Sequence, residues 1–268
     1  MTMTMRFDST RHNALAAAFH RDGMVVLPQL FEPARLQAWL QAFEPLLARH
    51  IAREGDNPNR GSHRHYVTLP FVTPFADPTI YENDDVLAVV ERILGRSMVM
   101  CQLATDTPLL GSNYQDLHRD TPPLFPEEGP ETPSFQLAVN FPLCDVTAEN
   151  GPLEYVRGTH RMSREEGLAR LEHGELQLEP LLMQLGDVVI RDVRHLHRGT
   201  PNRSSRSRPM VVIGYSRGWL FRPEVTIRVP RSVQAGLSDR ARALLRYNPV
   251  VDDADALLPV EPYREFAY

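Results

Sequence analysis

The clearest indication of the fold is the stretch GDVVIRDVRHLHRGTPNRSSRSRPMVVIGY, which spans residues 186–215. Two runs rich in β-branched residues, at 187–193 and 210–215, suit strands, and the polar residues at 202–207 suit the connector between them. Strands that follow each other closely along a chain usually lie side by side. This stretch therefore predicts two neighbouring strands of an antiparallel sheet.

The sequence on the N-terminal side of this stretch has the same texture as far back as Gly95. Short apolar runs at 98–104, 135–143 and 153–156 are separated by turn residues such as Asn-Gly, and a short helical insertion is expected at 163–171. Many short strands with closely spaced turns are typical of a sandwich or a jelly roll. The fold class is therefore expected to be mainly β, with flanking helices.

Helical patterns dominate the first part of the chain. The periodicity predicts helices at 13–19, 32–53 and 84–94, with Pro45 as a point where the second helix can kink or split. A strand is expected at 24–28.

The residues from 54 to 78 are too irregular for a confident element and are expected to form a functional loop. We expect a single domain over 1–268, with mostly helical support at 1–95, the β core at 96–222 and a C-terminal extension at 223–268 that holds a small helix near 238–245.

Composition limits the class of protein. The 268 residues are 42% hydrophobic and 24% charged, with a net charge of −5 and no basic stripe, which argues against a nucleic-acid partner and favours a small-molecule one. The only cysteines, Cys101 and Cys144, lie in apolar runs and suit reduced thiols in a cytoplasmic protein. A signal-peptide core and an apolar run of about 18 residues are both missing, so no membrane segment is expected.

The tripeptide His118-Arg119-Asp120 carries the first sign of chemistry. On extended backbone, residues i and i+2 point to the same side, so this imidazole and carboxylate can share one metal ion. Two histidines and one carboxylate with open positions on one face are the ligand set of non-haem iron(II) oxygenases. A third ligand is then required, and His197, just past the strand at 187–193, is the candidate.

Two ambiguities remain at the level of the residues. His20-Arg21-Asp22 repeats the same pattern, but it ends a predicted helix just before Gly23, where both side chains have ordinary structural roles. His195 and His197 share one side of the strand, so alternation alone does not separate them as the third ligand.

Arg208 distinguishes the second copy of the pattern from the first. It lies eleven residues after His197, at the start of the neighbouring strand. A 2-oxoglutarate molecule bound to iron by its keto-acid end leaves a distal carboxylate, and a guanidinium suits this group because it is permanently charged and bidentate. Arg203 and Arg206 are nearby alternatives, but they lie in the turn and are expected to be exposed.

The chain resembles the phytanoyl-CoA dioxygenase family of iron(II)- and 2-oxoglutarate-dependent oxygenases. The resemblance rests on four segments: FHRDGMVVLP at 19–28, LHRD at 117–120, ENGPLEYVRGTH at 149–160, and the stretch from GDVVI at 186–190 through HRGTPNRS at 197–204 to Arg208-Pro209. It implies a double-stranded β-helix core of the cupin-like type.

The resemblance also implies roles for individual residues. His118, Asp120 and His197 would be the iron ligands, and Arg208 would anchor 2-oxoglutarate. His197 is preferred to His195 because it precedes Arg-Gly, as the distal histidine of the family commonly does. The turn at 156–160 departs from the family, which commonly has Pro-Gly-Ser-His there, and this puts its local structure in doubt.

Further residues are expected around the cofactors. Supporting donors near the cosubstrate are Gln102, Gln115 and Gln136. Segments 60–75 and 121–133 are candidate lids. The candidates for substrate or lid contacts are His63, His65, Tyr66, Phe71 and His195. For His195 the alternative is a residue that supports the metal ligands from behind.

The implied activity is oxidation of a small molecule, with conversion of 2-oxoglutarate and O2 to succinate and CO2. Hydroxylation is favoured over halogenation, because related halogenases have a small residue in place of the carboxylate of Asp120. Two alternatives use the same residues: a catalytically silent binding protein on this fold, and a zinc hydrolase with the same three ligands.

Overall fold

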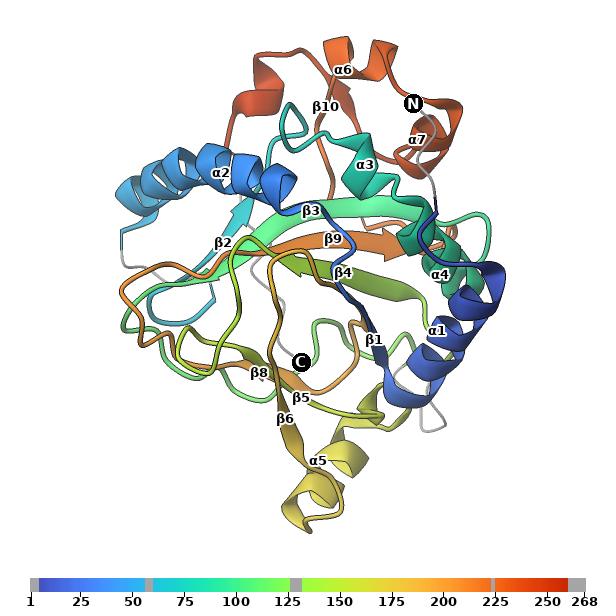
Figure 1. The fold of residues 1–268 in the computed structure, drawn as a ribbon, viewed down its shortest axis with the longest axis vertical. Helices are drawn as coiled ribbons and strands as arrows, with labels where there is room; N and C mark the ends of the chain where they lie inside the picture. The colour runs from blue at the N-terminus through green and yellow to red at the C-terminus, as the bar shows by residue number, and fades with distance from the viewer. Residues whose placement is uncertain (1–4, 56–59, 126–131, 223–224, 260–268) are drawn as a thin grey trace.

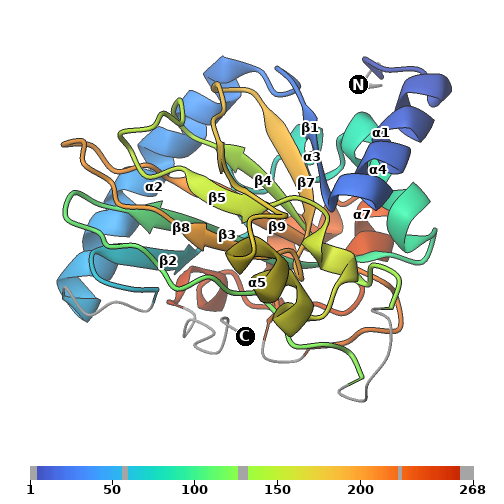
Figure 2. The same ribbon diagram turned by 90° about the horizontal axis from the view of Figure 1, so that it is seen from below.

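Two antiparallel sheets facing each other form the core of the molecule. The computed structural model describes residues 5–55, 60–125, 132–222 and 225–259. The large sheet has six strands in the order β1 (Met24–Leu27), β7 (Val188–Asp192), β4 (Gln136–Pro142), β9 (Met210–Ser216), β3 (Val99–Pro108) and β2 (Arg64–Thr68). The small sheet has three, in the order β6 (Leu178–Leu181), β5 (Leu153–Val156) and β8 (His197–Gly199). Figures 1 and 2 show the small sheet facing one side of the large one, the arrangement of a double-stranded β-helix.

The two faces of the large sheet have different chemistry, because successive side chains of a strand point to opposite faces. In β4, the residues that join the main apolar cluster are Leu137, Val139 and Phe141. The alternate residues line a cavity between the sheets; they are Gln136, Ala138 and Asn140. The outer face therefore carries the core and the inner face is available for a binding site.

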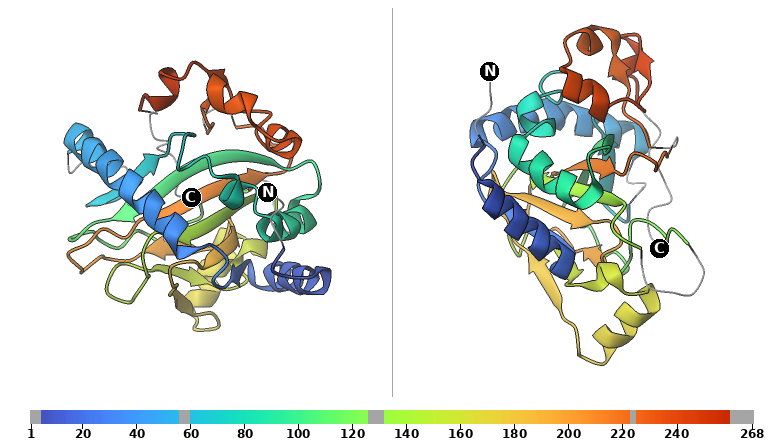
Figure 3. Two further views of the ribbon diagram at one scale, coloured as in Figure 1. Left: turned by 45° about the horizontal axis from the view of Figure 1, so that its top comes forward. Right: turned by 90° about the vertical axis from the view of Figure 1, so that its right-hand side faces the viewer.

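Helices cover the outer face. They are α1 (Ser9–Asp22), α2 (Pro33–Glu54), α3 (Pro78–Tyr81) and α4 (Asp84–Leu94). Figure 3 shows α2 crossing the large sheet, with α1 and α4 side by side at one end of it. Helix α1 ends where Gly23 takes a left-handed conformation (φ 80°), which turns the chain directly into β1. Pro45 lies inside α2 and does not split it.

The last part of the chain adds to the same apolar core. It contains β10 (Val229–Pro230), α6 (Arg231–Ala235), α7 (Asp239–Leu244) and β11 (Val250–Val251), followed by a 3-10 turn at Asp255–Leu257. Leu237, Ala241 and Leu244 are buried in the cluster that also holds the outer face of the sheet. In the first view this extension lies above β3 and α3 (Figure 1).

Most predicted elements are present with small changes in their bounds. Within the described residues the structure adds five strands that were not predicted, β2, β6, β8, β10 and β11, and the short helices α3 and α6. The segment from 54 to 78, expected to be an irregular loop, contains the edge strand β2, which pairs antiparallel with β3. Strands β6 and β8 were not predicted either; they have four and three residues. Such short strands exist because a neighbour supplies their hydrogen bonds, and a pattern within the strand does not reveal that. The described residues also include α5 (Arg164–Glu172) and a 3-10 turn at Thr159–Arg161.

Candidate metal and cosubstrate site

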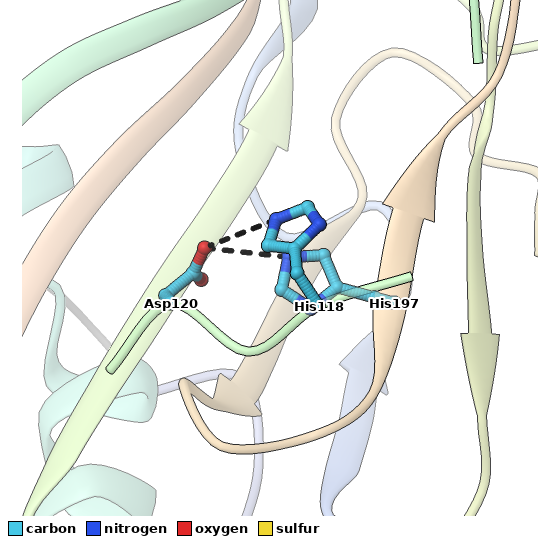
Figure 4. A group of neighbouring side chains, drawn as sticks. All are labelled: His118, Asp120 and His197. Atoms are coloured by element: carbon cyan, nitrogen blue, oxygen red, sulfur yellow. Dashed lines mark ion pairs between the residues drawn. The ribbon is translucent and has the colours of Figure 1, made fainter. Parts of the chain in front are cut away.

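Three potential metal ligands converge on one point between the sheets. The Oδ1 atom of Asp120 lies 3.4 Å from Nε2 of His197 and 3.8 Å from Nε2 of His118. Figure 4 shows the two imidazoles turned toward the carboxylate. One ligand atom from each residue lies within 4.8 Å of the others, and no other group of three or more His, Cys, Asp or Glu in the described part of the chain has this arrangement.

Backbone pairing brings these residues together. The amide of His118 donates to the carbonyl of His197, and the amide of His197 donates to the carbonyl of His118, both at 3.0 Å. The amide of Asp120 donates to the carbonyl of Val193 at 2.9 Å. The loop that carries His118 and Asp120 therefore runs beside β8 and reaches the end of β7. This pairing places His197, the third potential ligand, next to the other two.

Backbone carbonyls orient both imidazoles. Nδ1 of His118 is 2.7 Å from the carbonyl of Asp116, and Nδ1 of His197 is 2.8 Å from the carbonyl of His195. A proton on each Nδ1 satisfies these carbonyls and leaves the Nε2 lone pair free for a metal. Burial and the neighbouring His197 lower the pKa of His118 to about 4, so this imidazole is neutral at physiological pH, as a metal ligand must be.

Asp120 is held from the side by an arginine that sequence reasoning did not single out. Nη2 of Arg191 donates to Oδ2 of Asp120 at 2.6 Å, and Nε of Arg191 donates to Oδ1 of Asn140 at 3.2 Å. Burial by itself would raise the pKa of Asp120, but Arg191 and the two imidazoles bring it well below its usual value. The signal that could have revealed Arg191 is the pair of charged residues Arg191-Asp192 inside the strand run at 188–193, whose other residues are apolar.

Arg208 lines the same cavity as the three ligands. Its side chain is buried, and Nη2 donates to the carbonyl of Gly151 at 2.6 Å, while Nε has no hydrogen-bond partner within the described structure. Burial lowers the pKa of Arg208 to about 10, so the guanidinium stays charged at neutral pH. Gly151 has a φ of 82°, and a Cβ there would lie 2.9 Å from the carbonyl oxygen of Thr200, so the carbonyl that holds Arg208 depends on a glycine.

The three glutamines named as supporting donors all line this cavity. Gln115 is part of its wall: Nε2 donates to the carbonyl of Arg60 at 2.9 Å, and Oε1 accepts from the amide of Gly199 at 2.9 Å. Gln102 donates to the hydroxyl of Tyr66. The third, Gln136, lies on the inner face of β4.

Only one of the five substrate or lid candidates appears in the cavity lining. Tyr66 is that residue. His65 follows the opposite face of β2 and packs against His50 of α2, with ring centroids 5.4 Å apart. Phe71 is in the apolar core, and His63 lies against Gly111. Strand alternation explains the position of His65, because adjacent residues of β2 cannot both face inward and Tyr66 does.

For His195, which was expected either in the pocket or behind the metal ligands, the structure favours the second position. Its ring is fully buried and stacks on Tyr155 at 5.3 Å, and it is not among the residues that line the cavity. Its backbone carbonyl contributes instead, by holding His197. Of the second candidate lid, 121–133, residues 126–131 lie outside the described residues.

The turn at 156–160, which departs from the family pattern, supports the metal loop. The hydroxyl of Thr159 donates to the carbonyl of Val156 at 2.7 Å and accepts from the amide of Leu196 at 2.9 Å. The carbonyl of Thr159 accepts from Nη2 of Arg119 at 3.0 Å. This turn therefore ties β5 to the residues that precede His197 and to the residue between the first two ligands.

None of the described helices is both long and apolar enough to cross a bilayer.

Several solved structures share the fold of this chain. The epimerase SnoN from nogalamycin biosynthesis, in complex with Fe3+, alpha ketoglutarate and nogalamycin RO, matches with a TM-score of 0.59 and 19% identity, over 78% of this chain and 85% of that one. HygX from Streptomyces hygroscopicus, with nickel, 2-oxoglutarate and hygromycin B bound, matches with a TM-score of 0.59 and 17% identity, over 89% and 96%. The carbocyclase SnoK matches with a TM-score of 0.57 and 16% identity, over 79% and 85%.

The sequence itself matches a family model. The model described as phytanoyl-CoA dioxygenase (PhyH) matches residues 19–210, which run from the end of α1 to the start of β9 and include all three potential metal ligands and Arg208. With most of the chain matched and the three ligands in place, this chain belongs to the phytanoyl-CoA dioxygenase family.

Proposed function

We propose that this protein is an iron(II)- and 2-oxoglutarate-dependent dioxygenase that hydroxylates a small molecule. The observation that supports it most directly is the meeting of His118, Asp120 and His197 in a cavity that also contains a buried arginine, Arg208. The ligand set leaves positions for a bidentate cosubstrate and for oxygen. The guanidinium offers the distal carboxylate a charged partner.

The donor atoms fit these cofactors. Two imidazoles, of which His118 is neutral, and one ionised carboxylate suit iron(II). The buried Nε of Arg208, which has no partner within the described structure, suits an acid oxygen. When bound, iron and 2-oxoglutarate together with O2 supply an oxidant able to break a carbon–hydrogen bond. The role of the protein is to bind the metal and the cosubstrate, to keep Asp120 ionised and to limit the access of water.

The two alternatives explain the site less well. A zinc hydrolase needs the three ligands but has no use for a buried, charged Arg208 in the same cavity. A silent binding protein would have no need for three oriented ligands whose imidazoles are held by backbone carbonyls. Hydroxylation is the finer part of the proposal, because similar folds include an epimerase and a carbocyclase. It is supported by the carboxylate at Asp120, which a halogenase lacks.

Anaerobic addition of iron(II) and 2-oxoglutarate to the metal-free protein tests the cofactors. We expect a weak visible charge-transfer band that is absent in His197→Ala and unchanged in His20→Ala, the matched control from the first His-Arg-Asp tripeptide. If the unmodified protein gives no band, the oxygenase proposal is wrong.

The reaction type needs a separate measurement. A screen of small molecules for stimulated succinate release identifies a substrate, and the product mass then separates the outcomes. Hydroxylation under 18O2 adds one labelled oxygen, epimerisation leaves the mass unchanged, and ring closure removes two hydrogens. A product without the label would refute hydroxylation.

Two further expectations remain proposals. The chain is one domain, which is supported by the single apolar cluster that joins the N-terminal helices, the large sheet and the C-terminal extension. The protein acts in the cytoplasm, which is supported by two cysteines that form no disulfide in the structure.

A further inference from the structure

Arg191 is a charged residue on β7, a strand whose five residues are all buried. The other residues of β7 before it, Val188, Val189 and Ile190, are apolar and fully buried, and Arg191 itself is 7% exposed. A charge in such a place is costly unless each of its polar atoms finds a partner. The contacts of its guanidinium therefore indicate what this residue does.

Two of the three guanidinium nitrogens have protein partners. Nη2 donates to Oδ2 of Asp120 at 2.6 Å, and Nε donates to Oδ1 of Asn140 at 3.2 Å. Asn140 is fixed in turn, because its Nδ2 donates to the carbonyl of Val211 at 3.1 Å. The contacts form a chain that runs from the rigid strands β9, β4 and β7 to a side chain on a loop.

The chain of contacts makes the two oxygens of Asp120 unequal. Oδ2 accepts from Arg191, while Oδ1 faces the Nε2 atoms of His118 and His197. A carboxylate held in this way offers one oxygen to a metal and cannot rotate to offer both. This matters for the proposed chemistry, because the cosubstrate and O2 need the remaining positions.

We propose that Arg191 is a positioning residue, which holds Asp120 as a one-oxygen metal ligand and is itself fixed by Asn140. The inference rests on the proposed function and deepens it. The third nitrogen, Nη1, is buried and has no hydrogen-bond partner within the described structure, and Arg191 is one of the residues that line the cavity. It belongs to the same guanidinium that contacts the metal ligand, so it is placed to donate to the carboxylate of 2-oxoglutarate that binds at the metal.

The test is metal and cosubstrate affinity, measured without turnover. Co(II) is titrated into the metal-free full-length chain by calorimetry, and 2-oxoglutarate is then titrated into the Co(II) form. The variant Arg191→Lys keeps the charge and removes the fork of nitrogens. We expect Co(II) to bind about 10- to 100-fold more weakly, the usual effect of losing a partner of a metal ligand, and 2-oxoglutarate to bind more weakly as well.

Arg64 supplies the matched control. It is a buried arginine of the same cavity, and its carboxylate partner, Asp106 at 2.9 Å, is not one of the three ligands. Arg64→Lys is expected to leave the affinity for Co(II) within about twofold of the unmodified protein. An equal loss in both variants would mean that any disturbance of the cavity weakens the metal, and would overturn the proposal.

Asn140→Ala tests the same chain of contacts with Arg191 intact. If Arg191→Lys does not fold, this variant alone tests whether the contacts position Asp120. We expect a smaller loss of Co(II) affinity in the same direction. Co(II) affinity unchanged in every folded variant would overturn the positioning role, and unchanged 2-oxoglutarate affinity in Arg191→Lys would overturn the role of Nη1. Failure of the unmodified protein to bind Co(II) would instead refute the proposed function.

Discussion

The tripeptide His-Arg-Asp occurs twice in this chain, at 20–22 and at 118–120, and its two copies have different structures. The first copy is the last turn of α1, just before the glycine that leads into β1. The second lies on a loop whose backbone pairs with β8 and with the end of β7. The same three residue types therefore lie at the end of a helix in the first copy and beside a cavity between two sheets in the second.

The contacts of the middle arginine show the difference most clearly. Arg21 has 71% of its side chain exposed and pairs with the adjacent Asp22 at 2.6 Å, so it occupies the very carboxylate that a metal would need. Arg119 is 1% exposed and turns away from Asp120, donating to the carbonyls of Thr159 and Met162. The second carboxylate is thus left to its partners from other strands.

The comparison teaches that the pattern supplies two ligands and the fold supplies the rest. His197 comes from β8 and Arg191 from β7, and both are more than seventy residues away from Asp120 along the chain. Asp22 also has an arginine partner distant in sequence, Arg157 at 3.3 Å, but within the described residues no third potential metal ligand joins His20 and Asp22. A metal site therefore exists only where a third ligand is delivered.

Removing the carboxylate from each copy should give the largest contrast. Asp120→Ala is expected to weaken Co(II) binding by more than about 100-fold, beyond the loss caused by a supporting partner, because a direct ligand disappears. Asp22→Ala is expected to leave Co(II) affinity unchanged. Calorimetric titration of both variants measures this, and comparable losses would mean that the first copy takes part in the metal site.

Removing the middle arginine should separate the copies by stability. Arg119→Ala is expected to lower the free energy of unfolding by about 2 kcal/mol, because the carbonyls of Thr159 and Met162 both lose the buried guanidinium that donates to them. Arg21→Ala, at an exposed position, should leave the urea midpoint unchanged. Urea unfolding of both variants in the metal-free state provides the comparison. Equal midpoints would contradict the structural role assigned to Arg119.

The two copies should also differ in the pH dependence of stability. The pKa of His118 is about 4 in the folded protein and 6.5 in an ordinary setting, so between these values the unfolded chain binds more protons. The free energy of unfolding of the metal-free protein should therefore fall as the pH is lowered from 6.5 toward 4. His118→Asn should make this decline shallower, while His20→Asn should leave it unchanged. An unchanged slope in His118→Asn would contradict the lowered pKa.

Elements with a strong internal pattern were predicted closely. The helix at 84–94 and the strand at 153–156 have the expected bounds, because the apolar stripe of the helix and the short β-type run bounded by turn residues are visible in the sequence of the element itself. Strands β2, β6 and β8 were missed, because partners distant in sequence form their hydrogen bonds. The same reason applies at the site, where a sequence pattern named the potential ligands and Arg208 but not Arg119 or Arg191.

The sequence by itself determined the β-rich core and the residue types able to bind iron and an acid, because these follow from local periodicity and from the chemistry of side chains at short spacings. It also determined the family, through the match of residues 19–210 to the family model. The tertiary structure decided which His-Arg-Asp tripeptide faces the cavity, which oxygen of Asp120 is left for a metal, and which inward residues share the site. These outcomes depend on the pairing of strands far apart in the chain. That pairing places side chains within hydrogen-bond distance, and no local pattern specifies it.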